Sequence, residues 1–564
     1  MSDRYDSRMR QLDRLAAGLG VFALLVLIRR HGLPQFSPPP ALSFLVTAIL
    51  IAGLFLESFY RLLWVKDPWG YLARHPWRFL LLLMIVLELS GVAAWSTEQT
   101  VGAPGTAMRV SEIYLAILLF GFVGNWGKGV LATNRWLANR EIPVLALPAI
   151  TFAAAILLGG AALSLPGLHR YPLSLIDNLF TATSALCVTG LTVYDVSSAL
   201  TPVGQVVLAI LIQLGGLGTM TVVGWLALWQ RGTITVGERI ALSELVGGAR
   251  LGETRRLLKL ILTVTLVVEG IGATAFWLLW RPAVEHALLQ GVFHSISAFC
   301  NAGFALFSDS FAGFRGDPPT VFMLMLLIFL GGAGFPAIAN SFQAGLSRIL
   351  PWRENIALQP ASRLVLLWSA GLIVAGTILF WIDGWWSGSH RTLFEALFQS
   401  VSTRTAGFQV ETQLRFHNIG LLATIILMAI GASPQSTGGG IKTAVLARLF
   451  QRIDPRDAVA SSRWFVTFKP FRIALLLIVL YVLTALAAAF FLIYTDGLRL
   501  ADACFEAFSA LGTVGLSRDI TPGLSAAGKG IDIALMFAGR VLYPTLVMWL
   551  VRGRRECEDP VPWV

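Results

Sequence analysis

The sequence predicts an all-α integral membrane protein made of four fused repeats, each with two spanning helices and a re-entrant half-helix between them. Composition is the first reason: 56% of the 564 residues are hydrophobic, only 13% are charged, and the mean hydropathy is +0.71. A soluble protein has roughly 25% charged and 45–50% apolar residues. The other two reasons are apolar runs near bilayer-spanning length and a motif that recurs four times. These features exclude an ordinary water-soluble protein.

Apolar runs of nearly spanning length divide the chain. A transmembrane helix needs roughly 17–25 residues, and about twelve runs approach this length. The runs lie near residues 14–28, 42–57, 78–96, 110–127, 143–165, 204–229, 257–280, 320–345, 363–382, 418–447, 472–494 and 528–551. Residues 1–140 are therefore expected to form an accessory N-terminal module of about four transmembrane helices.

Positive charge is distributed as in a multi-pass membrane protein. The formal net charge is +11, but Lys and Arg lie in short clusters between the apolar runs, which argues against a nucleic-acid partner. Counting helices places nearly every cluster on one side, with Arg29 and Arg30 as the exception. Since basic loops face the cytoplasm, we predict a chain in the lipid bilayer of a bacterial inner (plasma) membrane, with twelve crossings and both termini cytoplasmic.

One motif occurs in each of four long connections between spanning runs. Its copies are FTATSALCVTGL (180–191), FHSISAFCNAGF (293–304), LFQSVSTRTAGF (397–408) and FEAFSALGTVGL (505–516). In each copy a large apolar residue precedes a glycine by ten positions. These glycines are Gly190, Gly303, Gly407 and Gly515, spaced 113, 104 and 108 residues apart. Helix packing could explain any one of them, but four copies in register favour a repeated functional segment.

The four repeats run in the same direction across the bilayer, because each begins and ends beside a basic loop. Parallel repeats place equivalent segments around one axis with pseudo-fourfold symmetry. A half-helix that ends at mid-membrane points its partly negative C-terminus at that axis, and the extended residues after it can turn carbonyl oxygens toward a cation. The predicted lining, here called the filter, consists of Val188, Thr189, Gly190, Asn301, Ala302, Gly303, Thr405, Ala406, Gly407, Thr513, Val514 and Gly515.

These considerations set the expected domain limits. The four helix–pore-loop–helix repeats are predicted at residues 141–230, 257–346, 363–450 and 471–552, after the module 1–140.

The third repeat contains helix breakers inside the apolar run 418–447. Gly431, Pro434 and the three glycines 438–440 make a continuous helix improbable. Irregular backbone at membrane depth is tolerated where it lines protein or a water-filled cavity. We therefore predict an intramembrane loop, with a kinked helix packed through its glycines as the alternative. The loop residues are Gly431, Ser433, Pro434, Gln435, Ser436, Thr437, Gly438, Gly439 and Gly440.

Two basic residues accompany this loop. Arg540 lies in the middle of the last apolar run, and an intramembrane arginine is a functional candidate by default. It is expected to face the cavity, where it donates to carbonyl groups of the 431–440 loop or repels cations. Snorkelling from a packed position is the alternative. Lys442 lies nearer the cytoplasmic end, so a gating role and simple snorkelling both stay open.

Taken together, the motifs resemble the Trk/Ktr/HKT superfamily of potassium transporters over about residues 141–551. The matching stretches are SALCVTGLTVYD (184–195), SAFCNAGF (297–304), STRTAGF (402–408), SALGTVGLS (509–517), IGASPQSTGGGIKT (430–443), ITPGLSAAGK (520–529) and MFAGR (536–540). In this family a glycine in all four filters accompanies potassium selectivity, and Gly190 agrees with that pattern. The resemblance implies K⁺ as the transported ion at the filter and no covalently bound cofactor.

The resemblance also implies a mechanism and partners. The loop 431–440 would gate the pore, and Arg540 matches an arginine that takes part in the gate. The family further implies a homodimer and a cytosolic ring of nucleotide-binding regulatory subunits.

Two other functions stay open at this point. The first is a symporter in which Na⁺ or H⁺ movement drives potassium. The second is an integral-membrane enzyme that acts on a lipid substrate with Arg540 and a buried Glu. Such an enzyme needs clustered His or Asp at an interface, which the sequence does not show, so we predict a transporter and not an enzyme.

Overall fold

The helices described below belong to one compact unit of the chain, residues 140–164 and 168–564. A computed structural model describes residues 146–218, 251–281, 283–349, 357–433, 436–443, 445–446, 469–543 and 546. The predicted accessory module 1–140 lies outside the described residues. The limits predicted for the four repeats stay predictions.

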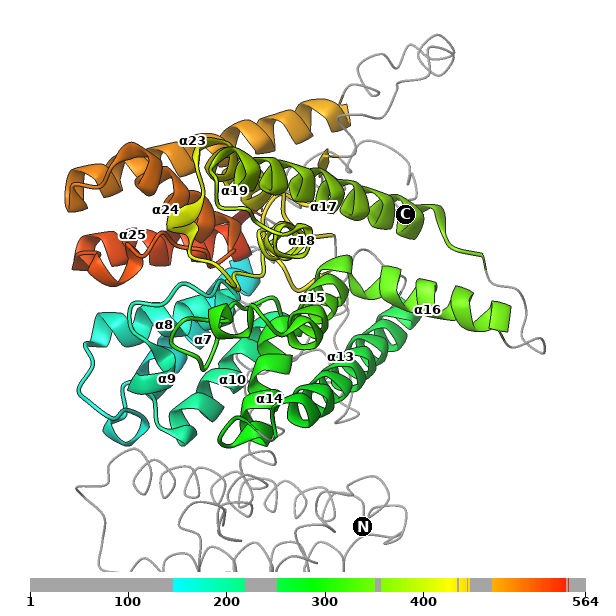
Figure 1. The fold of residues 1–564 in the computed structure, drawn as a ribbon, viewed down its shortest axis with the longest axis horizontal. Coiled ribbons are helices and arrows are strands. Elements are labelled where there is room, and N and C mark those ends of the chain that lie inside the picture. The colour runs from blue at the N-terminus through cyan, green and yellow to red at the C-terminus, as the bar shows by residue number, and fades with distance from the viewer. Residues whose placement is uncertain are drawn as a thin grey trace, which may run out of the picture. The chain divides into compact units, whose positions relative to one another are not determined.

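The described residues are helical and contain no strand, which confirms the all-α class. The helices come in four successive groups (Figure 1). The first two groups are α7 (Ala146–Leu163), α8 (Leu175–Cys187), α9 (Val196–Ala199), α10 (Pro202–Leu217), and α13 (Leu251–Trp280), α14 (Ala287–Phe299), α15 (Pro318–Ala333), α16 (Phe335–Ile349). The last two are α17 (Pro360–Trp386), α18 (Leu393–Ser402), α19 (Asn418–Ala429), and α23 (Lys469–Asp496), α24 (Leu500–Gly512), α25 (Ala526–Phe537). Short 3₁₀ turns lie in the connections: η4 (Ala312–Phe314), η5 (Gln413–Arg415) and η6 (Thr521–Gly523).

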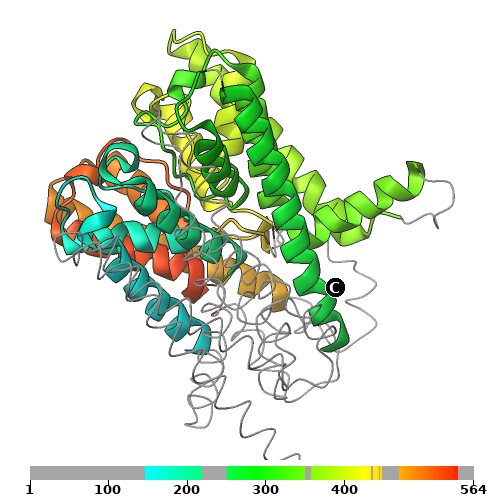
Figure 2. The same ribbon diagram turned by 90° about the horizontal axis from the view of Figure 1, so that it is seen from below.

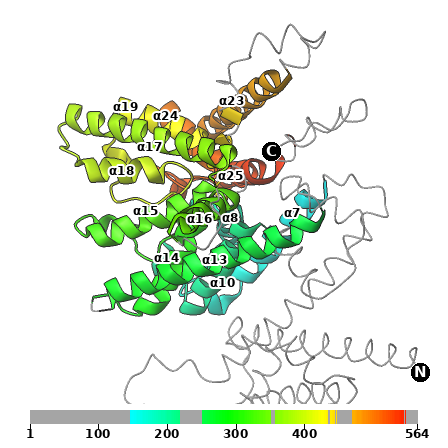
Figure 3. The same ribbon diagram turned by 90° about the vertical axis from the view of Figure 1, so that its right-hand side faces the viewer.

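The groups are arranged cyclically. Within each group the half-helix, which is α8, α14, α18 or α24, packs against the first helix (Figure 3). Between groups, the later helix of one packs against the half-helix of the next, in the pairs α10–α14, α15–α18, α19–α24 and α25–α8. The last pair closes the circle, and Figure 1 shows the groups in order around a common centre. Each half-helix is therefore packed between helices of its own group and of the group before it.

Local sequence explains where two of the half-helices, α8 and α18, begin. Ser174 accepts a hydrogen bond from the backbone N–H of Asp177 and caps α8. Thr392 and Glu395 form a reciprocal capping box at the start of α18. Such caps satisfy backbone donors that have no partner inside the helix, and each contributes about 1 kcal/mol. These two half-helices thus carry their own start signals, whereas α14 and α24 begin without a side-chain cap.

Helix lengths agree with a membrane protein. Among the described residues, three helices are long and apolar enough to cross a bilayer: Leu260–Trp280, Ser362–Trp386 and Ala474–Asp496. The half-helices are shorter, with 10–13 residues each. They are too short to span, as expected for re-entrant segments.

The structure differs from the sequence prediction between residues 320 and 345. One spanning helix was expected there, but α15 and α16 meet at an angle of 108°. Gly334 lies at the break with φ 88°, and Pro336 follows two residues later. A left-handed glycine ends a helix readily, and a proline disfavours helical geometry in the residue before it. As a result, α16 extends away from the other helices (Figure 2).

A buried charge cluster joins α17 to the segment after α18. The Arg391 side chain is 1% exposed, and its Nε lies 2.8 Å from a Glu411 carboxylate oxygen. Its Nη1 lies 3.5 Å from Asp383 and donates to the Phe380 carbonyl at 3.0 Å. Arg391 therefore balances two buried carboxylates within the third group.

We expect Arg391→Met to destabilise the folded protein by about 3–5 kcal/mol, because it leaves the Asp383 carboxylate buried without a cation and Glu411 with only the exposed Arg415. The matched control is Arg415→Met. Arg415 is 60% exposed and contacts the same Glu411 at 3.6 Å, so its loss is expected to cost less than about 1 kcal/mol. Thermal unfolding of the purified protein in detergent, followed by size-exclusion chromatography, measures both. Equal melting temperatures for the two variants would contradict this account.

Candidate ion pathway

Each half-helix ends in the same unusual backbone conformation. Two residues before each filter glycine, a non-glycine residue adopts a left-handed conformation, which is uncommon for residues with a Cβ. These residues are Val188 (φ 58°), Asn301 (φ 59°), Thr405 (φ 67°) and Thr513 (φ 49°). The glycines follow with φ of 98° for Gly190, 70° for Gly303, 77° for Gly407 and 93° for Gly515. Strained backbone of this kind is concentrated at functional sites.

The four glycines lie against one another in a closed ring. A Cβ added to Gly190 would lie 2.9 Å from the Cα of Gly303, and one added to Gly303 would lie 3.2 Å from the Cα of Gly407. The ring continues from Gly407 to Gly515 at 3.2 Å and from Gly515 back to Gly190 at 2.9 Å. Segments separated by more than a hundred residues therefore meet at one axis.

Carbonyl oxygens occupy the space beside each glycine. A Cβ on Gly190 would meet the Ala302 carbonyl oxygen at 2.5 Å, and one on Gly303 would meet that of Ala406 at 2.9 Å. The same holds for Gly407 with Val514 and for Gly515 with Thr189. Because positive φ and this crowding act together, the ring accommodates only glycine at these positions.

Serines of the half-helices hold the filter segments, and the sequence prediction did not include them as site residues. Ser184 Oγ accepts from the Gly190 N–H at 3.0 Å, and Ser509 Oγ accepts from the Gly515 N–H at 3.2 Å. In the second and third groups, Ser297 and Ser402 donate instead to the carbonyls of Phe304 and Phe408. The signal was present in the sequence, since each motif has a serine five or six residues before its glycine.

The filter segments are uncharged and, apart from the half-buried Gly303, buried among the groups. The Oγ1 atoms of Thr189, Thr405 and Thr513 are buried, and none has a hydrogen-bond partner in the part of the chain that the structure describes. A buried hydroxyl without a partner is costly, so its presence at the ring indicates a place where a ligand or water completes the bonding. The half-helix C-termini add partial negative charge at the same place. The arrangement suits a cation.

The residues of the predicted loop fold into a narrow hairpin after α19. The Gly431 N–H donates to the Ile441 carbonyl at 2.9 Å, and the Ala432 N–H donates to that of Gly439 at 3.2 Å. Gly431 approaches Gly440 so closely that an added Cβ would lie 2.7 Å from the Gly440 Cα. The helix therefore stops at Ala429, as the helix breakers predict. Pro434 and Gln435 lie outside the described residues.

The hairpin contacts the filter of two groups and the end of α15. An added Cβ on Gly438 would lie 3.3 Å from the Thr405 Cβ, and one on Gly439 would lie 3.1 Å from the Thr513 Cβ. The Thr437 hydroxyl donates to the Phe299 carbonyl at 3.1 Å. Two serines of the hairpin are also hydrogen-bonded. The Ser433 N–H donates to the Gly332 carbonyl at the end of α15, and the Ser436 hydroxyl donates to the Ser433 carbonyl.

Arg540 joins this hairpin to the first group. It lies in a π-helical turn, Ala538–Leu542, which continues α25. Its guanidinium donates to the Thr437 carbonyl and, at 2.7 Å, to the Gly215 carbonyl of α10. Lys442 donates to the Gly438 carbonyl at 2.6 Å. Both basic side chains thus bind carbonyl groups of the hairpin, although their role in gating stays a prediction.

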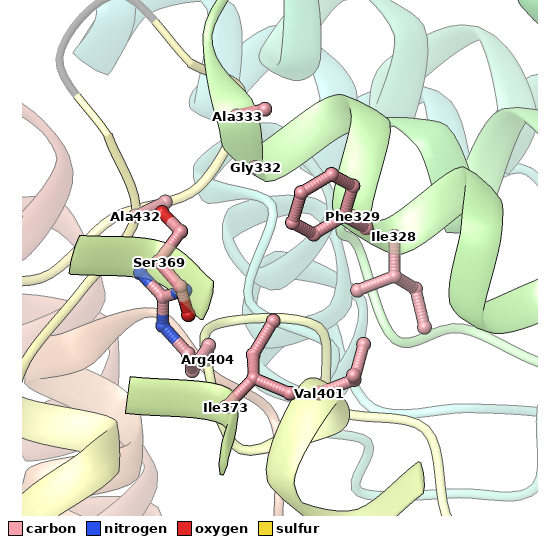
Figure 4. A pocket seen from close by; sticks show the side chains of 9 residues that line it. All are labelled: Ile328, Phe329, Gly332, Ala333, Ser369, Ile373, Val401, Arg404 and Ala432. Carbon is pink, nitrogen blue, oxygen red and sulfur yellow. The ribbon is translucent and has the colours of Figure 1, made fainter. Parts of the chain in front are cut away.

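A further arginine, which the sequence prediction did not include, anchors the start of the hairpin. Arg404 lies between the third half-helix and Thr405 and is only 8% exposed. Its guanidinium donates to the carbonyls of Ser369 at 3.2 Å and Gly431 at 3.4 Å. Arg404 also borders a small pocket (Figure 4), lined by Ile328, Phe329, Gly332, Ala333, Ser369, Ile373, Val401 and Ala432. The signal was available, because Arg404 is the one charged residue among the last seven positions of the four motif copies.

Comparison with known proteins identifies the family of this chain. The TrkH family, described as cation transport proteins, matches residues 146–382 and 387–552. This chain belongs to the TrkH family. Among curated relatives, the Ktr system potassium uptake protein B of Vibrio alginolyticus is 36% identical over 417 residues, 72% of this chain and 90% of the relative. The potassium/sodium uptake protein NtpJ of Enterococcus hirae is 31% identical, covering 74% of this chain and 95% of the relative.

A solved structure shows the same fold for this TrkH-family chain. The crystal structure of the potassium transporter TrkH from Vibrio parahaemolyticus superimposes with a TM-score of 0.58 at 18% identity, covering 85% of this chain and 99% of that one. The resemblance to the Trk/Ktr group and the all-α membrane class are thereby confirmed. Membership in a family of cation transport proteins also agrees with the prediction of transport rather than an enzymatic reaction.

Proposed function

We propose that this protein takes up potassium across the plasma membrane through a carbonyl-lined filter. The observation that supports this most directly is the closed ring of Gly190, Gly303, Gly407 and Gly515, with a carbonyl oxygen packed beside each glycine. Carbonyl rings replace the hydration shell of an alkali cation without the cost of a charged side chain. The relatives named as potassium uptake proteins supply the identity of the ion. In this proposal K⁺ is the transported ion, bound at the filter residues.

We further propose that the hairpin 431–440 is the gate. Gly438 and Gly439 lie directly against Thr405 and Thr513 of the filter, so the hairpin obstructs the path on that side. Arg540 and Lys442 hold it there through its carbonyl groups and add positive charge that opposes a cation. Opening requires these bonds to exchange for bonds to water. Arg404 binds the Gly431 carbonyl at the start of the hairpin. In this proposal that end stays in place when the rest of the hairpin moves.

Association with other subunits is part of the same proposal. Two relatives are named as components of a Ktr system, which supports association with other subunits. In our proposal these are a second copy of the chain and cytosolic nucleotide-binding regulatory subunits. The alternative function is Na⁺- or H⁺-coupled potassium symport, and the relative named as a potassium/sodium uptake protein favours keeping it. Currents measured against voltage at varied sodium and pH distinguish a channel from either symporter. An enzyme acting on lipid has no support from the described residues.

Potassium uptake is tested by rescue of a bacterium that lacks its own potassium uptake, with Gly190→Ser and Gly407→Ser as filter variants. Rescue by the wild type and a lower potassium-to-sodium selectivity in both variants are expected. If the wild type restores growth and neither substitution changes uptake or selectivity, the filter assignment is wrong.

Ser509→Ala tests how the filter is held. The change removes the acceptor of the Gly515 N–H and leaves that donor buried, at a cost of about 1–3 kcal/mol. We expect the potassium-to-sodium permeability ratio to fall by about fivefold or more, measured as competition of Na⁺ with ⁸⁶Rb⁺ uptake in proteoliposomes. Ser198→Ala, at an exposed hydroxyl on α9, is the control and is expected to keep the wild-type ratio. An unchanged ratio in Ser509→Ala would show that the serine does not support the filter.

A further inference from the structure

Asp532 is a buried carboxyl group that the proposed pathway does not use. It lies on α25 and is 0% exposed, and among the described residues neither carboxyl oxygen has a hydrogen-bond partner. An ionised carboxylate buried without hydrogen bonds or a cation is very costly, and such groups take up a proton instead. Whether Asp532 is protonated or ionised therefore depends on the charges and donors around it.

The charges that face Asp532 are negative or already paired. Asp532 lies one helical turn beyond Gly528, on the same buried face of α25, and Gly528 abuts the Asp496 carboxylate at the end of α23. From α24, the buried Glu506 lies within electrostatic range of Asp532, as does Asp496. Lys529 of α25 is bound to Asp177 of α8, with 2.6 Å between Nζ and Oδ1.

Glu506 differs from Asp532 because it has donors. It is also 0% exposed, but it accepts hydrogen bonds from the hydroxyls of Ser517, at 2.9 Å, and Thr521. Asp519 adds a further negative charge near it. Hydroxyl donors stabilise a carboxylate, so in this pair Glu506 carries the charge and Asp532 is the protonated partner.

This pair is connected to the filter. Glu506 belongs to the fourth half-helix, and Ser517, which it binds, follows the filter glycine Gly515 by two residues. On the same half-helix, Ser509 holds the Gly515 N–H. The charge on the pair therefore lies where it acts on the fourth filter segment. A metal centre is not indicated, since the described residues contain no group of three His, Cys, Asp or Glu side chains placed to bind one.

We propose that Asp532, together with Glu506, is a proton-binding site whose occupancy is linked to cation binding in the filter. With the proton bound, Asp532 is neutral. When the O–H bond breaks, the proton goes to water, and the carboxylate that is left adds a second negative charge beside the filter segment. That charge favours a cation, and by reciprocity a cation in the filter favours release of the proton. The linkage rests on the proposed potassium transport.

The first test measures ⁸⁶Rb⁺ uptake in proteoliposomes from about pH 6 to about pH 9, a range in which buried carboxyl groups titrate. For the wild type we expect the apparent KM to fall by about fivefold or more as the pH rises. Asp532→Asn keeps the shape of the side chain without a titrating proton, so its KM is expected to stay at the low-pH value throughout. Glu506→Gln removes the neighbouring charge and is expected to move the transition to lower pH. Asp309→Asn, at an exposed carboxylate, is the control and should follow the wild type.

The second test does not depend on transport. Infrared spectroscopy of the full-length protein in lipid is expected to show carbonyl bands of buried protonated carboxyl groups. Because Glu269 and Glu506 are buried as well, the Asp532 band is taken from the difference between wild type and Asp532→Asn, and Asp309→Asn is expected to keep it. Addition of K⁺ to weakly buffered wild-type protein is expected to release up to one proton per chain. A wild-type pH dependence in Asp532→Asn, or the absence of both the band and the proton release in wild type, overturns the proposal. If the band is present but no cation is transported, the transport proposal fails and the proton site stands.

Discussion

Gly515→Ala is expected to reduce potassium uptake by at least about a hundredfold while leaving the protein in the membrane. Gly515 has φ 93°, and an added Cβ would collide with the Thr189 carbonyl oxygen and lie 2.9 Å from the Gly190 Cα. Backbone strain of about 1–2 kcal/mol and displacement of a filter carbonyl act together. Displacing one carbonyl of a four-part ring changes the site for every ion that passes, so the effect on transport should exceed the effect on folding.

The measurement is initial ⁸⁶Rb⁺ uptake per unit of protein, with the amount of folded protein determined by size-exclusion chromatography. Gly530→Ala is the matched control, because Gly530 lies in the same group and an added Cβ there meets nothing within 4 Å. It is expected to transport at the wild-type rate. Near-normal uptake by Gly515→Ala would mean that the glycine ring is not the conduction path.

Arg540→Gln is expected to release the hairpin and raise basal potassium flux by about tenfold or more. Arg540 binds Thr437 of the hairpin and Gly215 of α10 at once, so its guanidinium fastens the proposed gate to the first group. Hydrogen bonds to a charged donor contribute roughly 1.5–3 kcal/mol, which corresponds to a change of about tenfold to a hundredfold in the closed population. Loss of the positive charge acts in the same direction, because it no longer opposes a cation.

Arg540→Lys separates the two effects. Lysine keeps the charge but cannot reach two carbonyl groups with a planar fork, so an intermediate flux is expected. Single-channel or proteoliposome flux without added regulatory subunits measures all three proteins. Flux below the wild-type level in both variants, with normal folding, would contradict a gate that Arg540 holds closed and would favour a role in keeping the pathway open.

Several features could be read from the sequence because they depend on local chemistry or on repetition. Scarce charge and long apolar runs indicate a membrane protein, since the bilayer excludes charge and requires internally bonded backbone. The glycines of the four motifs stand out because each needs a conformation that other residues avoid. The interruption between α19 and Lys442 follows from glycines alone, which explains why the hairpin was anticipated although its hydrogen bonds were not.

Other features depended on contacts between distant segments. The sequence run 320–345 contains Gly334 and Pro336, yet a kinked helix and a 108° bend have the same local signature, and only packing decides between them. Arg404 lies inside a recognised motif, but its role depends on the carbonyl groups of Ser369 and Gly431, which belong to other segments of the chain. In the sequence, Asp532 is one polar residue in an apolar run, and only the fold brings Glu506 within electrostatic range of it.

By itself, the sequence determined the class of the protein and the place where the third repeat breaks, and it predicted the four filter segments, because composition, periodic motifs and helix breakers act over short stretches. Only the tertiary structure decided that Gly190, Gly303, Gly407 and Gly515 close into one ring and that Arg540 binds the hairpin. It also decided that Asp532 is buried without a hydrogen-bond partner among the described residues. The physical reason is that hydrogen bonding, crowding and burial are properties of pairs, and the members of these pairs are brought together only when the chain folds.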